Sequence, residues 1–237
     1  MSSPGVGGAS DRGGRDGVTN VEHAFGLTIP RTLEEVCDPV HTALIVYDMQ
    51  VGIVSQLPDG SAVAKRVADV RGAARDCGMR VVYTRHMSLP REVAGVTQLR
   101  TAMAWQRVAR VADVKPVFLR DSPAFQITPE LTPAPSEVVF DKITMSAFEG
   151  TPLNIALRDC GVNAFVIVGI ALEVGIEPTV RHAMDLGYIP IIVADACGSG
   201  NNDAGQRALD SLAFCGGSLQ TDVKTICGLL HRSRASV

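Results

Sequence analysis

The stretch that decides the fold runs from Ala164 to Ala183 and reads AFVIVGIALEVGIEPTVRHA. It begins with an apolar run of the kind that forms a strand buried on both faces of a parallel sheet. A turn that contains Gly175 follows, and the spacing from about 176 to 186 predicts a helix that ends at Gly187. A strand that leads through a turn into a helix is the repeating unit of α/β proteins.

The same unit recurs on both sides of this stretch. Apolar runs predict strands over 43–48, 79–84, 137–141 and 188–194. Helical spacing and capping residues predict helices over 61–77, 152–160 and 203–214, and a short strand or helix near 221–230. Because strands that alternate with helices form a sheet covered on both faces, the sequence predicts a three-layer α/β/α fold. We expect a mostly parallel, doubly wound, Rossmann-like sheet of about six strands.

Length and composition fit one domain of this class. The chain has 237 residues, of which 46% are hydrophobic and 20% charged, as expected of a globular protein with a sizeable core. The first residues are rich in glycine and serine, so we expect a disordered tail over 1–20 and a single domain over 21–237. Residues 85–135 are rich in proline and polar side chains, which predicts long loops with short helices and a lid or substrate-facing region.

Charge and motifs limit the partners. A net charge of −3 favours neither nucleic acid nor an anionic membrane, and no apolar run approaches the roughly 20 residues that span a bilayer. The six cysteines are scattered without metal-ligand spacing, which indicates reduced thiols in a cytoplasmic protein and no metal site. Phosphate-binding glycine motifs are missing, so we expect no cofactor and a small-molecule substrate.

Charged or small residues stand at the carboxyl ends of several predicted strands. Asp48, Arg85, Lys142 and Gly175 all end or closely follow an apolar run. Ligands of open α/β sheets bind beyond these strand ends, at the point where the strand order reverses. Asp48 alone is also typical of a turn, and Lys142 alone of a surface lysine. Their shared position favours a site.

Several motifs in order make the chain resemble the isochorismatase-like hydrolase superfamily over about residues 40–215. They are Asp48-Met-Gln, the stretch KITMSAFEGT from Lys142, and VGIALEVG, which ends at Gly175. The resemblance implies that Asp48 and Lys142 are catalytic. In the amidohydrolase branch of the family a cysteine completes the triad, and the alignment puts Gly175 at that cysteine's position. Glycine cannot form a thioester.

The resemblance leaves more than one reaction open. The vinyl-ether branch of the family works without a thiol and resembles this chain in having glycine at that position. We therefore expect Asp48 to protonate an enol ether and water to capture the resulting oxocarbenium ion. One alternative is hydrolysis of an amide or imide C–N bond, including a variant in which the nucleophile has been removed. Another is an inactive member of the family that only binds a ligand.

The substrate contacts are expected around the same strand ends. Arg85 suits a substrate carboxylate, although both Arg85 and His86 are also typical of solvated loops, and His86 stands where isochorismatases resemble one another in having glutamine. Glu173 is a candidate for orienting water beside Gly175. Two aromatic residues, Trp105 and Phe125, are candidates for the pocket wall or the core. The resemblance also implies a cis peptide bond between Ile170 and Ala171, and a homo-oligomer, either dimer or tetramer.

Overall fold

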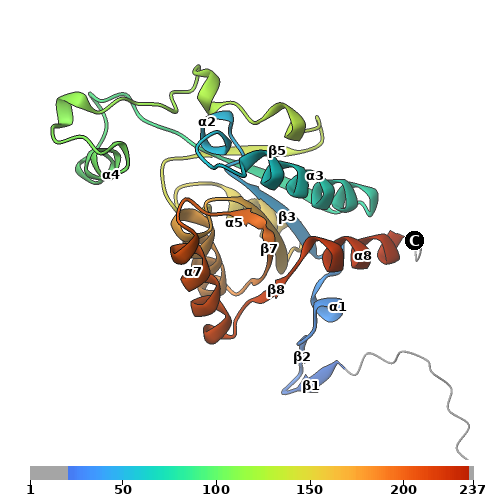
Figure 1. The fold of residues 1–237 in the computed structure, drawn as a ribbon. Coiled ribbons are helices and arrows are strands. Elements are labelled where there is room, and N and C mark those ends of the chain that lie inside the picture. The colour runs from blue at the N-terminus through green and yellow to red at the C-terminus, as the bar shows by residue number, and fades with distance from the viewer. Residues whose placement is uncertain (1–20, 235–237) are drawn as a thin grey trace, which may run out of the picture.

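The computed structural model describes residues 21–234, and the predicted tail over 1–20 lies outside them. Six parallel strands form the central sheet in the order β5-β4-β3-β6-β7-β8. Helices lie around this sheet (Figure 1). The strands are β3 (Thr42–Tyr47), β4 (Arg80–His86), β5 (Val138–Lys142), β6 (Ala164–Ile170), β7 (Ile189–Gly198) and β8 (Leu219–Thr221). The number of strands and their direction confirm the predicted sheet.

Helices cover both faces of the sheet, which confirms the three-layer architecture. One face carries α3 (Gly60–Asp76) and α8 (Val223–Arg234), which pack against each other. The other carries α5 (Leu153–Asp159), α6 (Glu177–Asp185) and α7 (Asn202–Cys215). The two faces have separate apolar cores because successive side chains of a strand point to opposite sides.

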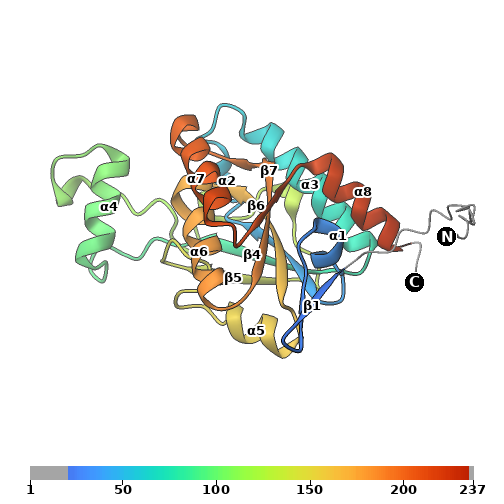
Figure 2. The same cartoon turned by 90° about the horizontal axis from the view of Figure 1, so that it is seen from below.

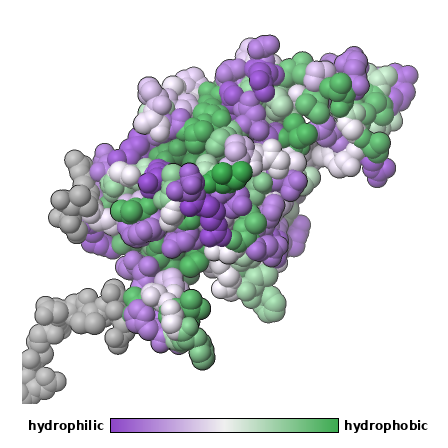
Figure 3. Space-filling view, turned by 180° about the vertical axis from the view of Figure 1, so that it is seen from behind, coloured by the Kyte–Doolittle hydropathy of each residue, from purple (hydrophilic) through white to green (hydrophobic). Residues whose placement is uncertain are grey.

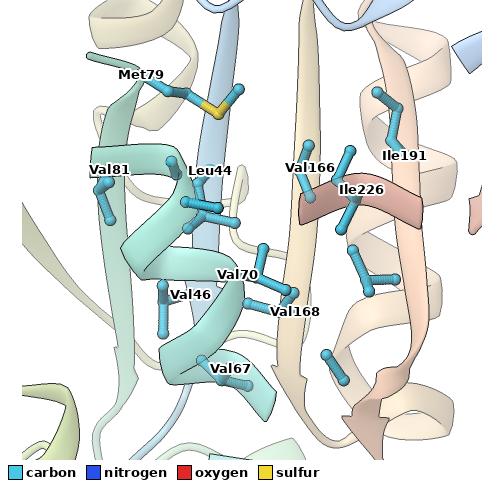
Figure 4. Close-up of a cluster of buried hydrophobic side chains, with 14 of the residues drawn as sticks. Leu44, Val46, Val67, Val70, Met79, Val81, Val166, Val168, Ile191 and Ile226 are labelled. Carbon is cyan, nitrogen blue, oxygen red and sulfur yellow. The ribbon is translucent and has the colours of Figure 1, made fainter. Parts of the chain in front are cut away.

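The core under α3 and α8 is built from small branched side chains. Leu44, Val46 and Val168 on the sheet meet Val67 and Val70 on α3, and all five are fully buried (Figure 4). β-branched residues fill a pleated, buried surface with little loss of side-chain freedom. The sheet is therefore a rigid base for residues at its edge.

Strand order reverses between β3 and β6. From β3 the chain moves outward through β4 to β5, and from β6 it moves outward in the other direction through β7 to β8. The two central strands pair in parallel from Thr42 with Ala164 to Tyr47 with Gly169. Their carboxyl ends mark the switch point at which α/β folds bind ligands.

Several element boundaries differ from the predicted ones. β4 continues to His86 and β5 to Lys142, because both strands keep their ladder pairing to the sheet edge. β7 continues to Gly198, and the chain end forms both β8 and α8. Between β6 and α6, residues Leu172–Ile176 form a turn of π-helix, so Gly175 lies inside a helical turn.

Other elements lie outside this repeating pattern. An antiparallel hairpin of β1 (Glu22–Ala24) and β2 (Leu27–Ile29) precedes α1 (Leu33–Val36). A short helix, α2 (Val51–Val54), follows β3.

The connection between β4 and β5 is long and contains α4 (Val96–Gln106), as expected for residues 85–135. The part of this connection around α4 stands away from the body of the domain (Figures 1 and 2), whereas Phe125 and Leu131 further along it are buried. Its surface mixes apolar and polar residues (Figure 3), and the exposed large apolar ones are Val93, Val96, Trp105, Val111 and Val117.

Candidate active site

Asp48 and Lys142 form a buried ion pair at the switch point. Lys142 Nζ donates to Asp48 Oδ2 at 2.7 Å and to the carbonyl oxygen of Thr144 at 3.0 Å. Thr84 Oγ1 donates to the other carboxylate oxygen, Asp48 Oδ1, at 2.6 Å. Asp48 is 4% exposed and Lys142 3% exposed. The structure thus brings together the two residues predicted to be catalytic, and every charged atom in the pair has a partner.

Three neighbouring strands position this pair and Thr84. Asp48 directly follows β3 and has a φ of 47°, a left-handed conformation in which an L-residue is uncommon. Thr84 lies near the end of β4, and Lys142 ends β5. Because β4 lies between β3 and β5, the long lysine side chain spans β4 to reach the carboxylate.

A tyrosine occupies the space beside Gly175. A Cβ atom added to Gly175 would lie 2.5 Å from Tyr47 Cε1 and closer still to Tyr47 Cζ and the phenol oxygen. The Tyr47 hydroxyl donates to the carbonyl oxygen of Met145, and Lys142 Nζ lies 4.4 Å from the centroid of the ring. Tyr47 therefore fills the position that the resemblance assigns to the nucleophilic side chain.

Gly169 allows the two central strands to meet at this point. It lies opposite Tyr47 in the ladder and has a φ of 129°. A Cβ atom there would overlap the Tyr47 carbonyl group and lie 2.9 Å from the Tyr47 nitrogen. The close approach of these two backbones fixes Tyr47 relative to the turn that carries Gly175.

Gln50 holds the backbone around His86. Its Oε1 accepts from His86 N at 2.6 Å, and its Nε2 donates to the carbonyl oxygens of His86 and Phe125, each at 3.0 Å. Gln50 is fully buried. One amide thus joins the end of β3, the end of β4 and the segment around Phe125.

His86 lies on the same face of the sheet as Lys142, its ladder partner. Burial lowers the pKa of His86, the Lys142 charge lowers it further, and the Asp48 charge opposes both. The imidazole is therefore neutral at neutral pH. Its ring meets Phe118 edge-on at 5.8 Å and Trp105 at 6.3 Å between centroids. His86 and Trp105 thus lie beside each other, and Trp105 is 52% exposed.

Arg85 lies apart from this group, contrary to its expected position. Residue 85 belongs to β4, so its side chain points to the face opposite Thr84 and His86. Its guanidinium binds Asp141 at 2.8 Å and lies 4.2 Å from the centroid of the Phe125 ring. Phe125 is fully buried and belongs to the core. Asp141 also lies 3.7 Å from Arg120, so Arg85 belongs to an ion-pair group on the face of the sheet opposite Thr84 and His86.

Glu173 lies in the turn after β6. Its Oε1 accepts from Asn201 N at 3.0 Å, next to the start of α7, and its Oε2 is buried without a hydrogen-bond partner among the described residues. The Ile170–Ala171 peptide bond is cis. Ala171 O accepts from Gly175 N at 3.0 Å and from Ile176 N at 3.1 Å. These two bonds close the π-helical turn and direct the Gly175 Cα toward Tyr47.

Tyr47, Thr84 and Gln50 were missed as site residues. Tyr47 is the one aromatic residue in the run ALIVY that precedes Asp48, and Thr84 is the polar residue near the end of an apolar strand. These residues stand out in the sequence. Their place in the site can be assigned only once the sheet order is known, because that order puts β3 between β4 and β6.

The described residues also include a cavity, but no candidate metal site and no membrane-spanning helix. A cavity of about 280 Å³ lies at the amino ends of β7 and β8, with Arg31 as its charged lining residue. It is at the opposite edge of the sheet from Asp48, so we place the site at the ion pair. Among residues 21–234 no cluster of His, Cys, Asp and Glu is arranged to hold a metal ion. No helix in that range is long and apolar enough to cross a membrane.

The buried Asp48–Lys142 pair thus lies at the switch point of a three-layer α/β/α fold, where proteins of this architecture bind their ligands. The Isochorismatase domain family matches residues 42–222, which include all six strands of the large sheet, Asp48 and Lys142. The chain belongs to the isochorismatase family of hydrolases.

The chain is similar to proteins named as amidohydrolases and cysteine hydrolases. The ureidoacrylate amidohydrolase RutB of Methylobacterium radiotolerans is 30% identical over 207 residues, which cover 80% of this chain and 78% of the relative. A cysteine hydrolase from Pseudomonas syringae superposes with a TM-score of 0.68 at 22% identity, covering 84% of this chain and 96% of that one. An N-carbamoylsarcosine amidase from Thermoplasma acidophilum superposes with a TM-score of 0.64 at 22% identity, covering 77% and 96%. The two solved structures support the fold.

Proposed function

We propose that the protein hydrolyses a C–N bond in a small amide or ureide, using Asp48 and water without a covalent intermediate. The curated relatives named as ureidoacrylate amidohydrolases support the choice of bond. The observation that carries the mechanism is the Asp48–Lys142 pair at 2.7 Å, beside a glycine whose side-chain space is taken by Tyr47. Gly175 alone favours hydrolysis of an enol ether. The relatives named as amidohydrolases favour hydrolysis of a C–N bond instead.

Asp48 is equipped to act as a general base. Each carboxylate oxygen accepts one strong hydrogen bond and keeps a lone pair for water. The water gives a proton to Asp48 as its oxygen bonds to the carbonyl carbon. The C–N bond of the tetrahedral intermediate then breaks, and the leaving nitrogen takes the proton from Asp48. One water is consumed, one ammonia or amine is released, and the enzyme is regenerated.

Two neighbours support this role of Asp48. The Lys142 ammonium holds the carboxylate in place, and its charge offsets negative charge that develops on the substrate carbonyl oxygen. The His86 imidazole, neutral because burial lowers its pKa, offers one hydrogen-bond donor and one acceptor for an amide group. We therefore retain His86 as a substrate contact and assign Arg85 to the Asp141 pair.

A panel of substrates tests the choice of bond. Purified protein is incubated with small amides, N-carbamoyl compounds and ureido acids, and ammonia release is measured. We expect at least one ureido or N-carbamoyl compound to be hydrolysed, with the activity unchanged after iodoacetamide treatment and lost in Asp48→Asn. Loss of activity on thiol alkylation, or full activity in Asp48→Asn, would contradict the mechanism.

Enol-ether hydrolysis is the second candidate, and Gly175 favours it. In that reaction Asp48 starts protonated, gives its proton to the enol-ether carbon, and water captures the oxocarbenium ion. Isochorismate belongs in the same panel. Its consumption without release of ammonia from any C–N substrate would select this second reaction. If every substrate is unchanged but a ligand binds, the protein is a binding member of the family.

A further inference from the structure

We propose that Tyr47 and Gly175 form a coupled pair in which the tyrosine ring takes the volume of the missing side chain and makes glycine obligatory. Under this proposal the site is closed to a thiol by its packing, whichever bond the protein hydrolyses. A single change of Gly175 to cysteine then gives no cysteine hydrolase, because the ring stands where the new side chain would go. Tyr47 thus determines that hydrolysis proceeds without a cysteine nucleophile at position 175.

The first support is the geometry around Gly175. The three heavy atoms nearest to an added Cβ all belong to Tyr47, and the furthest of them is 2.5 Å away. Real Cβ atoms do not approach other atoms so closely. Gly175 lies in a helical turn and does not have a positive φ. The requirement for glycine therefore comes from space and not from backbone conformation.

The second support is that the ring cannot easily move away. Tyr47 is 2% exposed, and its hydroxyl donates to Met145 O. Its ring lies against the Lys142 ammonium at 4.4 Å, a cation–π contact that is strengthened by burial. Its backbone is fixed by the close approach of Gly169. Displacing the ring breaks the hydrogen bond to Met145 O and the contact with Lys142, the residue that binds Asp48.

The phenol itself does not replace the thiol as a nucleophile. Burial, and then the neighbouring Asp48 charge, raise the pKa of Tyr47 well above its usual value. The hydroxyl therefore keeps its proton at neutral pH and donates it to Met145 O. Its role is to fill space and to seat Lys142, so we class it as a positioning residue.

A double-mutant cycle in melting temperature tests the pair without an activity assay, so its failure is distinct from failure of the proposed function. Gly175→Ala adds only a Cβ and is made in the wild-type, Tyr47→Phe and Tyr47→Val backgrounds. We expect it to lower Tm by roughly 4 °C or more in the first two, since both keep the ring. In Tyr47→Val we expect no loss, because alanine is otherwise preferred to glycine in a helix.

Gly72→Ala is the matched control. Gly72 lies in α3, and an added Cβ meets nothing within 4 Å, so this change should leave Tm unchanged or raise it in every background. Tyr47→Leu replaces Tyr47→Val if the latter does not fold. Equal losses from Gly175→Ala in all backgrounds, or no loss in the wild type, would overturn the coupling.

The role of Tyr47 in seating Lys142 has a separate readout. With any substrate found in the panel, Tyr47→Phe should keep the ring under the ammonium and retain most of kcat, whereas Tyr47→Leu should lower kcat and shift its pH profile. A pH profile that is the same in the wild type and Tyr47→Leu would limit Tyr47 to packing and overturn this part of the proposal.

Discussion

At the scale of single residues, the burial of Asp48 and Lys142 matters as much as their identity. Removing one member of a buried ion pair leaves the other without its counter-charge, which costs about 3 kcal/mol or more. We expect Asp48→Asn to lower the free energy of unfolding by about that amount, and to reduce kcat by about 10²- to 10⁴-fold through loss of the general base. Urea unfolding and an ammonia-release assay measure the two effects.

A second variant separates these two effects of Asp48. In Asp48→Asn/Lys142→Met no buried charge is left unpaired, so most of the lost stability should return while activity stays absent. If the double variant were as unstable as Asp48→Asn alone, desolvation of Lys142 would not be the cause. If it were active, the pair would not be catalytic.

His86 gives the protein a pH-dependent stability term. Its pKa is lowered in the folded state, chiefly by burial, so the unfolded chain binds a proton first as the pH falls below about 6.5. Below that pH the protonation of His86 in the unfolded chain lowers the free energy of unfolding, and above that pH His86 makes no such contribution. We expect His86→Gln to lose less stability than the wild type between pH 7 and pH 5, as measured by urea unfolding. Parallel losses in the two proteins would contradict a half-buried, neutral His86.

The residue scale also shows what the sequence could predict about the site. Asp48, Lys142 and His86 were predicted from strand ends and motifs, and the structure places them together. Arg85 was assigned to the site because β4 was expected to end at residue 84. Since β4 in fact continues to His86, the alternation of side chains sends Arg85 to the other face. Tyr47 could not be linked to Gly175, because that contact joins residues that are distant in the sequence.

At the scale of elements, the pairing of β3 with β6 depends on Gly169. Gly169→Ala would push a Cβ into the Tyr47 backbone, where no side-chain rotation relieves the overlap. We expect a loss of more than about 3 kcal/mol, or failure to fold. Gly150→Ala is the control, because φ there is also positive at 72° but an added Cβ meets nothing within 4 Å. It should cost only about 1 kcal/mol. Similar losses for both variants would mean that φ alone, and not the close approach, requires glycine.

Gln50 tests how the end of β3 is tied to its neighbours. Gln50→Met keeps the approximate volume but leaves His86 N and two carbonyl oxygens without their partner. The expected loss is about 2 kcal/mol in thermal or urea unfolding. Gln56 is an exposed control, since its amide donates only to Gly52 O at the surface. Gln56→Met should cost less than about 0.5 kcal/mol, and equal losses would contradict the role of Gln50.

Element boundaries were harder to predict than element types. The helix expected over 61–77 is α3, Gly60–Asp76, because its apolar spacing matches a single buried face. The helix expected from residue 176 is α6, and the chain is already helical before it, because a π-helical turn over Leu172–Ile176 leads into α6. Such a turn leaves no periodic signature in five residues. The ends of β4 and β5 were underestimated because charged residues can continue a ladder at the sheet edge.

At the scale of the whole molecule, the strand order assembles the site from distant segments. Asp48, Lys142 and Gly175 come from three separate strand–helix units, and the reversal between β3 and β6 brings them to one edge of the sheet. The alternation of strands and helices was enough to predict this architecture, because few topologies bury both faces of a parallel sheet. Fold and family do not decide the reaction, which depends on what stands beside Asp48.

The central claim is that a water molecule activated by Asp48, and not a side chain of the protein, attacks the carbonyl carbon of the substrate. Its most direct test is intact-protein mass spectrometry of samples quenched in acid during steady-state turnover, with ammonia release followed in parallel. We predict that the protein keeps its unmodified mass while product accumulates. A mass increase equal to the acyl part of the substrate, present during turnover and absent afterwards, would contradict the account.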